Sequence, residues 1–138
     1  MHAARLFSLG LEQSELMFSC FRVKTELFGS LGATGAGHGS PKAIILGLEG
    51  ESPDTVDIDN IDARVTAARE HGRMALLGKH QIPFDYRADL IMHRTETLPF
   101  HPNGMRFTAY NDEDQPILTR VYYLSLIHIS EPTRQHWI

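Results

Sequence analysis

The clearest pattern in the chain is an alternation of hydrophobic and polar residues over positions 21–27. Side chains along a β-strand point to opposite faces in turn, so this period of two predicts a strand with one buried and one solvated face. The residues assigned to the buried face are Phe21, Val23, Thr25 and Leu27, and those assigned to solvent are Arg22, Lys24 and Glu26. The strand leads directly into a glycine-rich stretch.

Two segments on either side of this strand have helical spacing. Residues 2–17 carry hydrophobic positions about every third or fourth residue, with an interruption at Gly10. Residues 41–48 predict a short apolar helix, which Gly47 weakens and Gly50 can end.

The acidic residues that follow predict a loop with an extended piece at residues 56–58. A third helix is expected to begin after a cap at Asn60 or Asp59 and to stop at Gly72.

The last part of the chain predicts strands joined by turns. The strand-like runs span residues 77–84, 89–95, 105–110 and 117–123. Asn103-Gly104 is a strong turn dipeptide, and residues 111–114 suit a hairpin loop. This order of elements predicts an α+β fold with helices packed on one mostly antiparallel sheet.

The stretch from Gly29 to Gly39 holds five glycines in eleven residues. Such density predicts sharp turns or a contact surface made of main chain. Ser40 is expected to cap the following helix, with Pro41 as its first residue. A loop that leads into a helix N-terminus offers free N–H groups to an anion such as a carboxylate or phosphate. A flexible connector is the alternative.

The loop does not match the common phosphate-binding motifs. Gly32 and Gly37 have the spacing of a P-loop, but His38-Gly39 stands where Gly-Lys-Ser/Thr is required. The dinucleotide fingerprint also fails after Gly35, which disfavours a nucleotide-binding enzyme. His38 could act as an acid, a base or a hydrogen-bond donor near neutral pH, although a surface histidine is equally compatible with the pattern.

Other candidate ligands are scattered. His80, His93 and His101 lie on separate elements without zinc-site spacing, so structural or exposed roles are expected. The acidic residues between 54 and 62 lack the spacing of a calcium loop. Cys20 is placed at the polar side of its strand and is expected to be inert.

Composition narrows the function further. A chain of 138 residues allows one domain of ordinary size, and its net charge of -4 argues against nucleic acid as a partner. No apolar run is long enough to span a membrane, and the first residues do not resemble a secretory signal. One cysteine favours a reducing compartment, here the cytoplasm, and cannot hold an iron–sulfur cluster, which takes about four thiolates.

The final residues depart from the rest of the pattern. Residues 124–138 read LSLIHISEPTRQHWI and resemble translated sequencing-adapter sequence. We therefore expect one domain at residues 1–123 and a non-native tail at 124–138. A natural strand extension with a frayed end is the alternative.

Four sequence blocks together resemble the bacterial iron–sulfur L-serine dehydratases. The blocks are LFGSLGATGAGHG at 27–39, AIILGLEG at 43–50, TVDID at 55–59 and LPFHPNGM at 98–105. The resemblance covers roughly residues 3–123 and implies the β domain of an enzyme that converts L-serine to pyruvate and ammonia. It also implies a fold similar to the allosteric substrate-binding domain of certain D-3-phosphoglycerate dehydrogenases.

The resemblance further implies a division of labour. In this family a separate α domain holds a [4Fe-4S] cluster, so this chain is expected to bind no cofactor and to be inactive alone. Its expected partners are L-serine or a related small carboxylate, the catalytic α domain or subunit, and possibly a second copy in a homodimer. The alternative is a free-standing carboxylate-binding module without catalysis.

The resemblance places the functional residues in and near the loop. His38 is the catalytic candidate, and the ligand or domain-interface candidates are Ser30, Thr34, Gly35, Gly37, Ser40 and Asn103. The family's opening Ser-Ser-Ser-His-Thr segment is missing, as though the gene model started late. Ala36 and Pro41 stand where relatives often carry a basic residue and aspartate, which puts loop contacts by those side chains in doubt.

Overall fold

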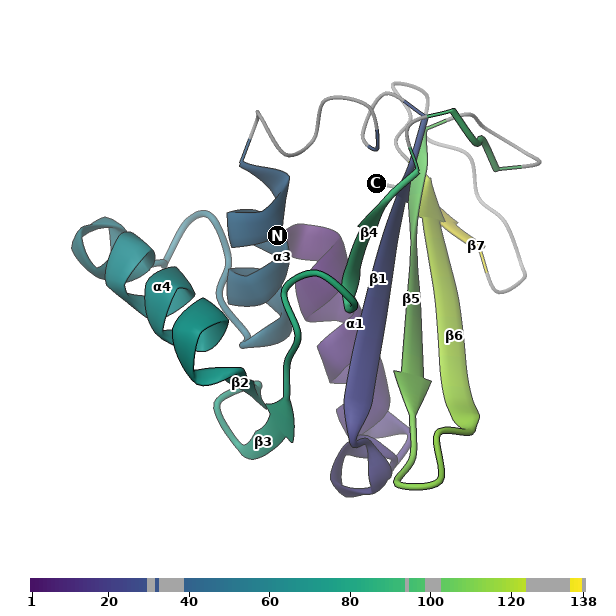
Figure 1. Ribbon diagram of the computed structural model, residues 1–138, viewed down its shortest axis with the longest axis horizontal. Helices are drawn as coiled ribbons and strands as arrows, with labels where there is room; N and C mark the ends of the chain where they lie inside the picture. Colours follow the sequence, from purple (N-terminus) through teal and green to yellow (C-terminus); the bar gives the residue numbers. More distant parts are fainter. Residues whose placement is uncertain (30–31, 33–38, 94, 99–102, 124–134, 138) are drawn as a thin grey trace.

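A computed structural model shows helices packed on one face of a mixed sheet, with a small second sheet beside them (Figure 1). The structure describes residues 1–29, 32, 39–93, 95–98, 103–123 and 135–137. The predicted α+β class is confirmed. The likeness to the D-3-phosphoglycerate dehydrogenase domain stays a prediction.

The helices form two layers beside the sheet. They are α1 (His2–Gln13), α3 (Ser40–Leu48) and α4 (Ile61–His71), with the short 3₁₀ turns η1 (Met17–Ser19) and η3 (Ile58–Asn60). Helices α1 and α3 lie against the sheet and α4 packs on α3 (Figure 1). The Ser8 hydroxyl donates to the Leu48 carbonyl at 2.8 Å, which joins α1 to the last turn of α3.

The main sheet has the strand order β4-β1-β5-β6-β7. Its strands are β1 (Arg22–Phe28), β4 (Leu90–Met92), β5 (Gly104–Tyr110), β6 (Pro116–Tyr123) and β7 (Gln135–Trp137). The β1–β5 and β5–β6 pairs are antiparallel, whereas β4 and β7 run parallel to their neighbours. A separate hairpin pairs β2 (Arg73–Leu76) with β3 (His80–Pro83).

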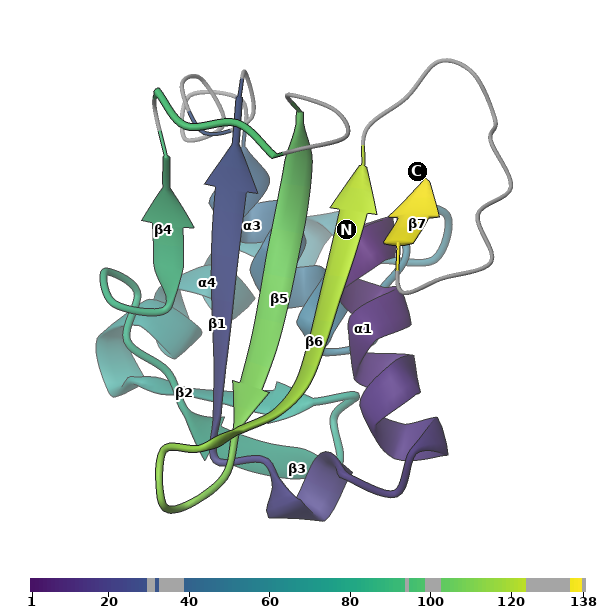
Figure 2. The same cartoon turned by 90° about the vertical axis from the view of Figure 1, so that its right-hand side faces the viewer.

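Two ends of the main sheet matter below (Figure 2). The loop end is where β1 and β4 finish and β5 begins, next to the glycine-rich stretch. The underside is the opposite end, which carries η1, the β2–β3 hairpin and the turn between β5 and β6.

Aromatic stacking fixes α1 to the sheet. Phe7 and Phe107, both with no exposed surface, stack with ring centroids 5.3 Å apart. Tyr122 meets the edge of Phe107 at 5.6 Å. Offset and edge-on arrangements of this kind add to the energy of burial. Cys20 lies in the same core and is also fully buried, which corrects its predicted place on a polar face.

The predicted cap of α3 is wrong in detail. The helix begins at Ser40 itself, and the N-cap is Gly39, whose φ of +79° lies in the left-handed region. Glycine enters this region without steric cost, so it can redirect the chain into the helix. Among the described residues, no side chain caps the α3 N-terminus.

Two further predictions are corrected by local turns. The run at 77–84 is the turn and second strand of a hairpin rather than one strand, because Leu77 and Gly78 both take positive φ and reverse the chain between β2 and β3. The extended piece predicted at residues 56–58 reaches only to Asp57, whose backbone is extended, because the Asp57 carboxylate accepts a hydrogen bond from the Asp59 backbone and η3 starts at Ile58. The predicted stop of α4 at Gly72 is confirmed.

Gly104 is the first residue of β5 and not part of a turn. A Cβ at this position would lie 2.6 Å from Leu98 Cδ1 and 2.9 Å from the Tyr122 carbonyl oxygen. The glycine therefore allows close packing over the sheet, which a turn-dipeptide reading cannot anticipate.

The chain beyond β6 is described only at β7, where Gln135–Trp137 pairs parallel to β6. The non-native origin of the tail stays a prediction. Within the described residues, no helix combines the length and apolar character needed to cross a bilayer.

Two helical glycines should respond oppositely to alanine. Gly10→Ala should raise the free energy of unfolding by about 0.5–1 kcal/mol, because a Cβ there meets nothing within 4 Å and glycine costs helix entropy. Gly47→Ala should lower it by about 1–3 kcal/mol, because its Cβ would lie 2.2 Å from the Met1 carbonyl oxygen. Denaturant unfolding measures both, and equal gains would contradict close α1–α3 packing at Gly47.

Candidate functional site

The loop end of the main sheet is built around one buried carboxylate. Glu26, in β1, is only 5% exposed. It accepts hydrogen bonds from Arg106 Nε at 2.7 Å and Nη2 at 2.9 Å, and from His93 Nε2 at 3.0 Å. Arg106 stands directly across from Glu26 in the β1–β5 register, and His93 follows β4 on the other side. Three neighbouring strands are thus joined through one side chain.

An aromatic ring lies beside these charges. Phe28 stacks on the His93 ring with centroids 4.5 Å apart, and the Arg106 guanidinium lies 5.1 Å from the Phe28 ring centre. Phe28 also packs with Leu98 and Tyr123 in a small second core. Because Glu26 and Phe28 belong to the sheet face away from the helices, β1 is buried on both faces at this end.

The neighbours of Glu26 decide its charge. Burial opposes ionisation, but the hydrogen bonds from Arg106 and His93 outweigh it and hold the pKa of the carboxyl below its ordinary value of 4.5. The same bond raises the pKa of Arg106. Glu26 and Arg106 therefore form an ion pair at neutral pH.

Gly32 lies directly against this cluster. A Cβ on Gly32 would lie 2.2 Å from the His93 carbonyl oxygen and 2.6 Å from that of Leu27. The His93 backbone N–H donates to the Leu27 carbonyl at 2.9 Å, so the ends of β1 and β4 are joined beside Gly32. Only glycine allows the backbone at position 32 to approach this closely.

The N-terminus of α3 supplies the electrostatic part of the site. Its first turn holds no acidic residue and receives no side-chain cap from the part of the chain that the structure describes. The unpaired N–H groups and the helix dipole give this end a partial positive charge. A carboxylate or phosphate is the ligand that such an end attracts.

Most of the predicted site residues lie outside the described residues. These are Ser30, Thr34, Gly35, Gly37 and His38. Ser40 is the first residue of α3, and Asn103 immediately precedes β5 at the loop end; both are half-buried. His101 is outside the described residues, whereas His80 and His93 make the structural contacts expected of them.

Glu26, Arg106 and His93 are the residues that the pattern does not predict to be together. The alternation assigned Glu26 to solvent, and it is wrong at this position. The assignment of Phe21 to the buried face is also wrong, since Phe21 is 47% exposed. The pairing of Glu26 with Arg106 depends on the strand register across eighty positions of sequence, and no local signal carries that information.

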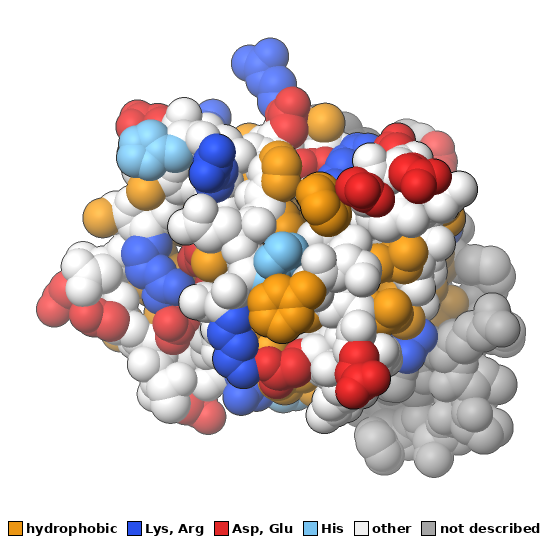
Figure 3. Space-filling view, turned by 90° about the horizontal axis from the view of Figure 1, so that it is seen from below, with side chains coloured by type: hydrophobic (Ala, Val, Ile, Leu, Met, Phe, Trp, Pro, Cys, Tyr) orange, Lys and Arg blue, Asp and Glu red, His pale blue; other side chains and the backbone are white. Residues whose placement is uncertain are grey.

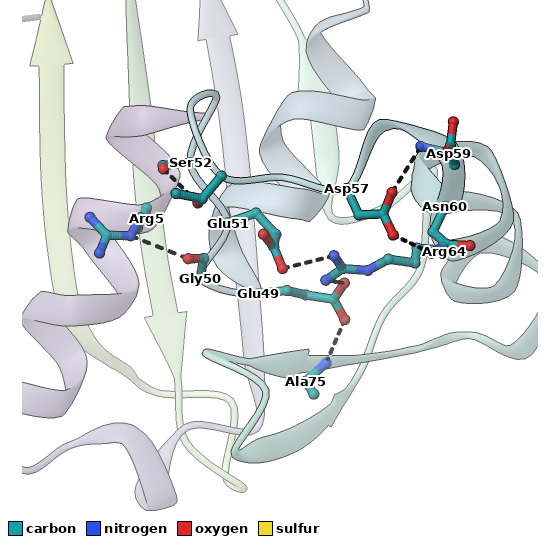
Figure 4. Close-up of polar contacts among 11 residues, drawn as sticks. Arg5, Glu49, Gly50, Glu51, Ser52, Asp57, Asp59, Asn60, Arg64 and Ala75 are labelled. Atoms are coloured by element: carbon teal, nitrogen blue, oxygen red, sulfur yellow. Dashed lines mark hydrogen bonds and ion pairs between the residues drawn. The ribbon is translucent and has the colours of Figure 1, made fainter.

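A second charged cluster has a structural role (Figure 4). Arg64 of α4 donates to Glu51 at 2.8 Å and to Glu49 at 3.2 Å, and Glu49 also accepts from the Ala75 backbone at 3.2 Å. The cluster thus fastens α4 and β2 to the end of α3. It borders a cavity of about 340 Å³ next to the second half of α4.

The chain has too few cysteines for an iron–sulfur cluster held by thiolates alone. Its one cysteine, Cys20, is buried, and burial raises the pKa of the thiol to about 11. Such a cluster takes about four thiolates. Within the described residues, no group of three or more histidine, cysteine or acidic side chains could hold a metal ion.

The fold and the site define an α+β domain with a charge-paired sheet end, against which Gly32 of the glycine-rich stretch packs. Residues 1–125 match the family described as serine dehydratase beta chain, and the chain belongs to this family.

Several similar proteins are L-serine dehydratases. The chain is 51% identical over 123 residues to an L-serine dehydratase of Streptomyces coelicolor, covering 89% of this chain and 27% of the relative. It is 39% identical over 124 residues to L-serine dehydratase TdcG of Escherichia coli, with the same coverage of 89% and 27%. A Mycobacterium bovis relative is 37% identical over 123 residues, 89% of this chain and 26% of its own length. The chain therefore spans about a quarter of the length of these relatives.

Arg106→Met should lower the free energy of unfolding by about 3–5 kcal/mol, because it leaves a buried carboxylate without its guanidinium partner. Arg120→Met is the matched control on the neighbouring strand, where the side chain makes one long contact to the Thr119 carbonyl at 3.4 Å. It should change stability by less than about 0.5 kcal/mol. Equal losses in urea unfolding would contradict the role of the Glu26 ion pair.

The Glu26 ion pair should also appear in the pH dependence of stability. Since its folded pKa is lowered, its contribution is complete above 4.5 and is lost as the pH falls through the folded value. The stability difference between the wild type and Glu26→Gln should therefore shrink on acidification. The control is Glu113→Gln at an exposed position, and its stability should differ little from that of the wild type at every pH. Thermal melts across the acid range measure this, and parallel curves for Glu26→Gln would contradict it.

Proposed function

We propose that this chain forms the β part of an L-serine dehydratase, which converts L-serine to pyruvate and ammonia in the cytoplasm. The observation that carries the proposal is the 51% identity over 123 residues to an L-serine dehydratase. The match includes the glycine-rich loop and both strands of the Glu26 ion pair. The single cysteine agrees with a reducing compartment.

The remainder of the enzyme would come from a catalytic α domain or subunit. The relatives are almost four times as long as the matched region, so most of their length has no counterpart here. One buried thiol does not fit a [4Fe-4S] cluster, and we assign that cofactor to the α part. The isolated chain should then lack activity.

The loop end would face the substrate and the α part. The α3 N-terminus, with Gly39 and Ser40, would attract the serine carboxylate through backbone N–H groups. His38 is proposed to hold or accept a proton. The other proposed ligand or interface residues at the loop end are Ser30, Thr34, Gly35, Gly37 and Asn103. Loss of the α-proton and the hydroxyl gives aminoacrylate and water, and hydrolysis of aminoacrylate gives pyruvate and ammonia.

A free-standing carboxylate-binding module is the second candidate function. It is supported by the α3 N-terminus, which has no acidic first turn and no side-chain cap within the described ranges. Such a module would bind small carboxylates in the absence of any catalytic partner. Titration of the isolated chain with L-serine, followed by pyruvate assay, separates this function from the enzymatic one.

A chimera tests the enzymatic proposal directly. Residues 1–123 of this chain would replace the matched region of the Streptomyces coelicolor relative, and the chimera should release pyruvate from L-serine. The same chimera with Gly32→Ala should lose at least about tenfold in kcat/KM, because displacing a positioning loop by even an ångström is costly. A folded chimera without activity would contradict the proposal.

The isolated chain supplies the complementary measurement. Purified residues 1–138 should form no pyruvate from L-serine, with the active chimera as the positive control. Pyruvate release by the isolated chain would show that catalysis does not need an α part. It would contradict the proposal that the α part holds the cofactor needed for activity.

A further inference from the structure

Two cavities on the underside of the molecule meet at the β2–β3 hairpin. The apolar cavity, of about 240 Å³, is lined on one side by Phe21 and Pro83. The polar cavity, of about 340 Å³, is the one that the Arg64 cluster borders. Arg73 of β2 and Gln81 of β3 line both cavities, so the two adjoin at these side chains. Small-molecule sites have volumes of roughly 300–1,000 Å³, and the adjoining cavities are large enough for such a ligand.

The apolar cavity has hydrophobic walls on a fixed support. Ile82, in its lining, is buried, whereas Phe21 is 47% exposed although it is aromatic. The His80 ring in the same lining is held by a hydrogen bond from its Nε2 to the Cys20 carbonyl at 2.8 Å. Figure 3 shows this face, with hydrophobic side chains near its centre and basic side chains beside them. An apolar group that entered the cavity would leave water and would also cover the exposed surface of Phe21.

Arg73 supplies the available charge between the two cavities. Its side chain is exposed and makes no ion pair or hydrogen bond within the described part of the chain. The other arginine in the polar cavity, Arg64, is already paired with Glu49 at 3.2 Å and with Glu51 at 2.8 Å. A guanidinium presents two parallel N–H groups that match the two oxygens of a carboxylate. Gln81 offers an amide N–H donor beside it.

We propose that the adjoining cavities bind a small carboxylic acid that carries an apolar side chain. The carboxylate pairs with Arg73, and the apolar side chain fills the apolar cavity against Phe21 and Pro83. L-Serine does not suit this site, because its hydroxymethyl group would place a polar oxygen in the apolar cavity. The site lies on the underside, opposite the loop end, so the inference does not depend on the proposed function.

Titration of the purified chain with isocaproate, a branched aliphatic acid, tests the proposal. Amide NMR shifts should change along the β2–β3 hairpin and at Phe21, and not at the loop end. Acetate keeps the charge without the apolar side chain, and isocaproamide keeps the side chain without the charge. Each should bind at least about tenfold more weakly than isocaproate, because each lacks one of the two contacts. L-Serine should not displace isocaproate.

The substitution Arg73→Met identifies the cation. It should weaken isocaproate binding by at least about tenfold and leave isocaproamide binding unchanged, because only the acid uses the guanidinium. Phe21→Ser should weaken the binding of both compounds. Arg87→Met is the matched control, since Arg87 is exposed and lines neither cavity, and it should leave both affinities unchanged.

The ratio of acid to amide affinity within one variant separates a direct contact from a loss of structure. Misfolding would weaken both compounds, whereas loss of the Arg73 contact removes the preference for the acid alone. Circular dichroism checks that each variant is folded. Absence of isocaproate binding, equal affinities for the acid and the amide, or an unchanged preference for the acid in Arg73→Met would each overturn the proposal.

Discussion

The ion pair between Glu26 and Arg106 is the interaction on which the loop end of this domain depends. A carboxylate that is 5% exposed is tolerated only because Arg106 and His93 satisfy it. The same three side chains join β4, β1 and β5 at the point where the chain leaves the sheet. The glycine-rich stretch therefore starts from a rigid base, and Gly32 is packed against that base.

This arrangement suits a domain that positions a loop for a partner. The side chains at the loop end are engaged with one another, and the α3 N-terminus contributes backbone N–H groups. Within the described residues, neither feature provides a metal-binding set. A separate α part that holds the cofactor is the simplest division of labour for the L-serine dehydratase that we propose.

The two ends of β1 differ in a way that bears on assembly. At the loop end both faces of the strand are buried, whereas at the underside Phe21 is exposed beside the η1 turn. We propose that the loop end, where both faces of the strand are buried, serves the α part.

Local sequence was sufficient for features that depend on neighbouring residues. Period-two and helical spacing predicted β1, α1, α3 and the β5–β6 hairpin, Gly72 predicted the end of α4, and four sequence blocks identified the family. Tertiary structure decided what depends on register and close approach: the burial of Glu26, the strand role of Gly104 and the exposure of Phe21. The physical reason is that burial and pairing are set by segments far apart along the chain, which hydrophobic periodicity does not record.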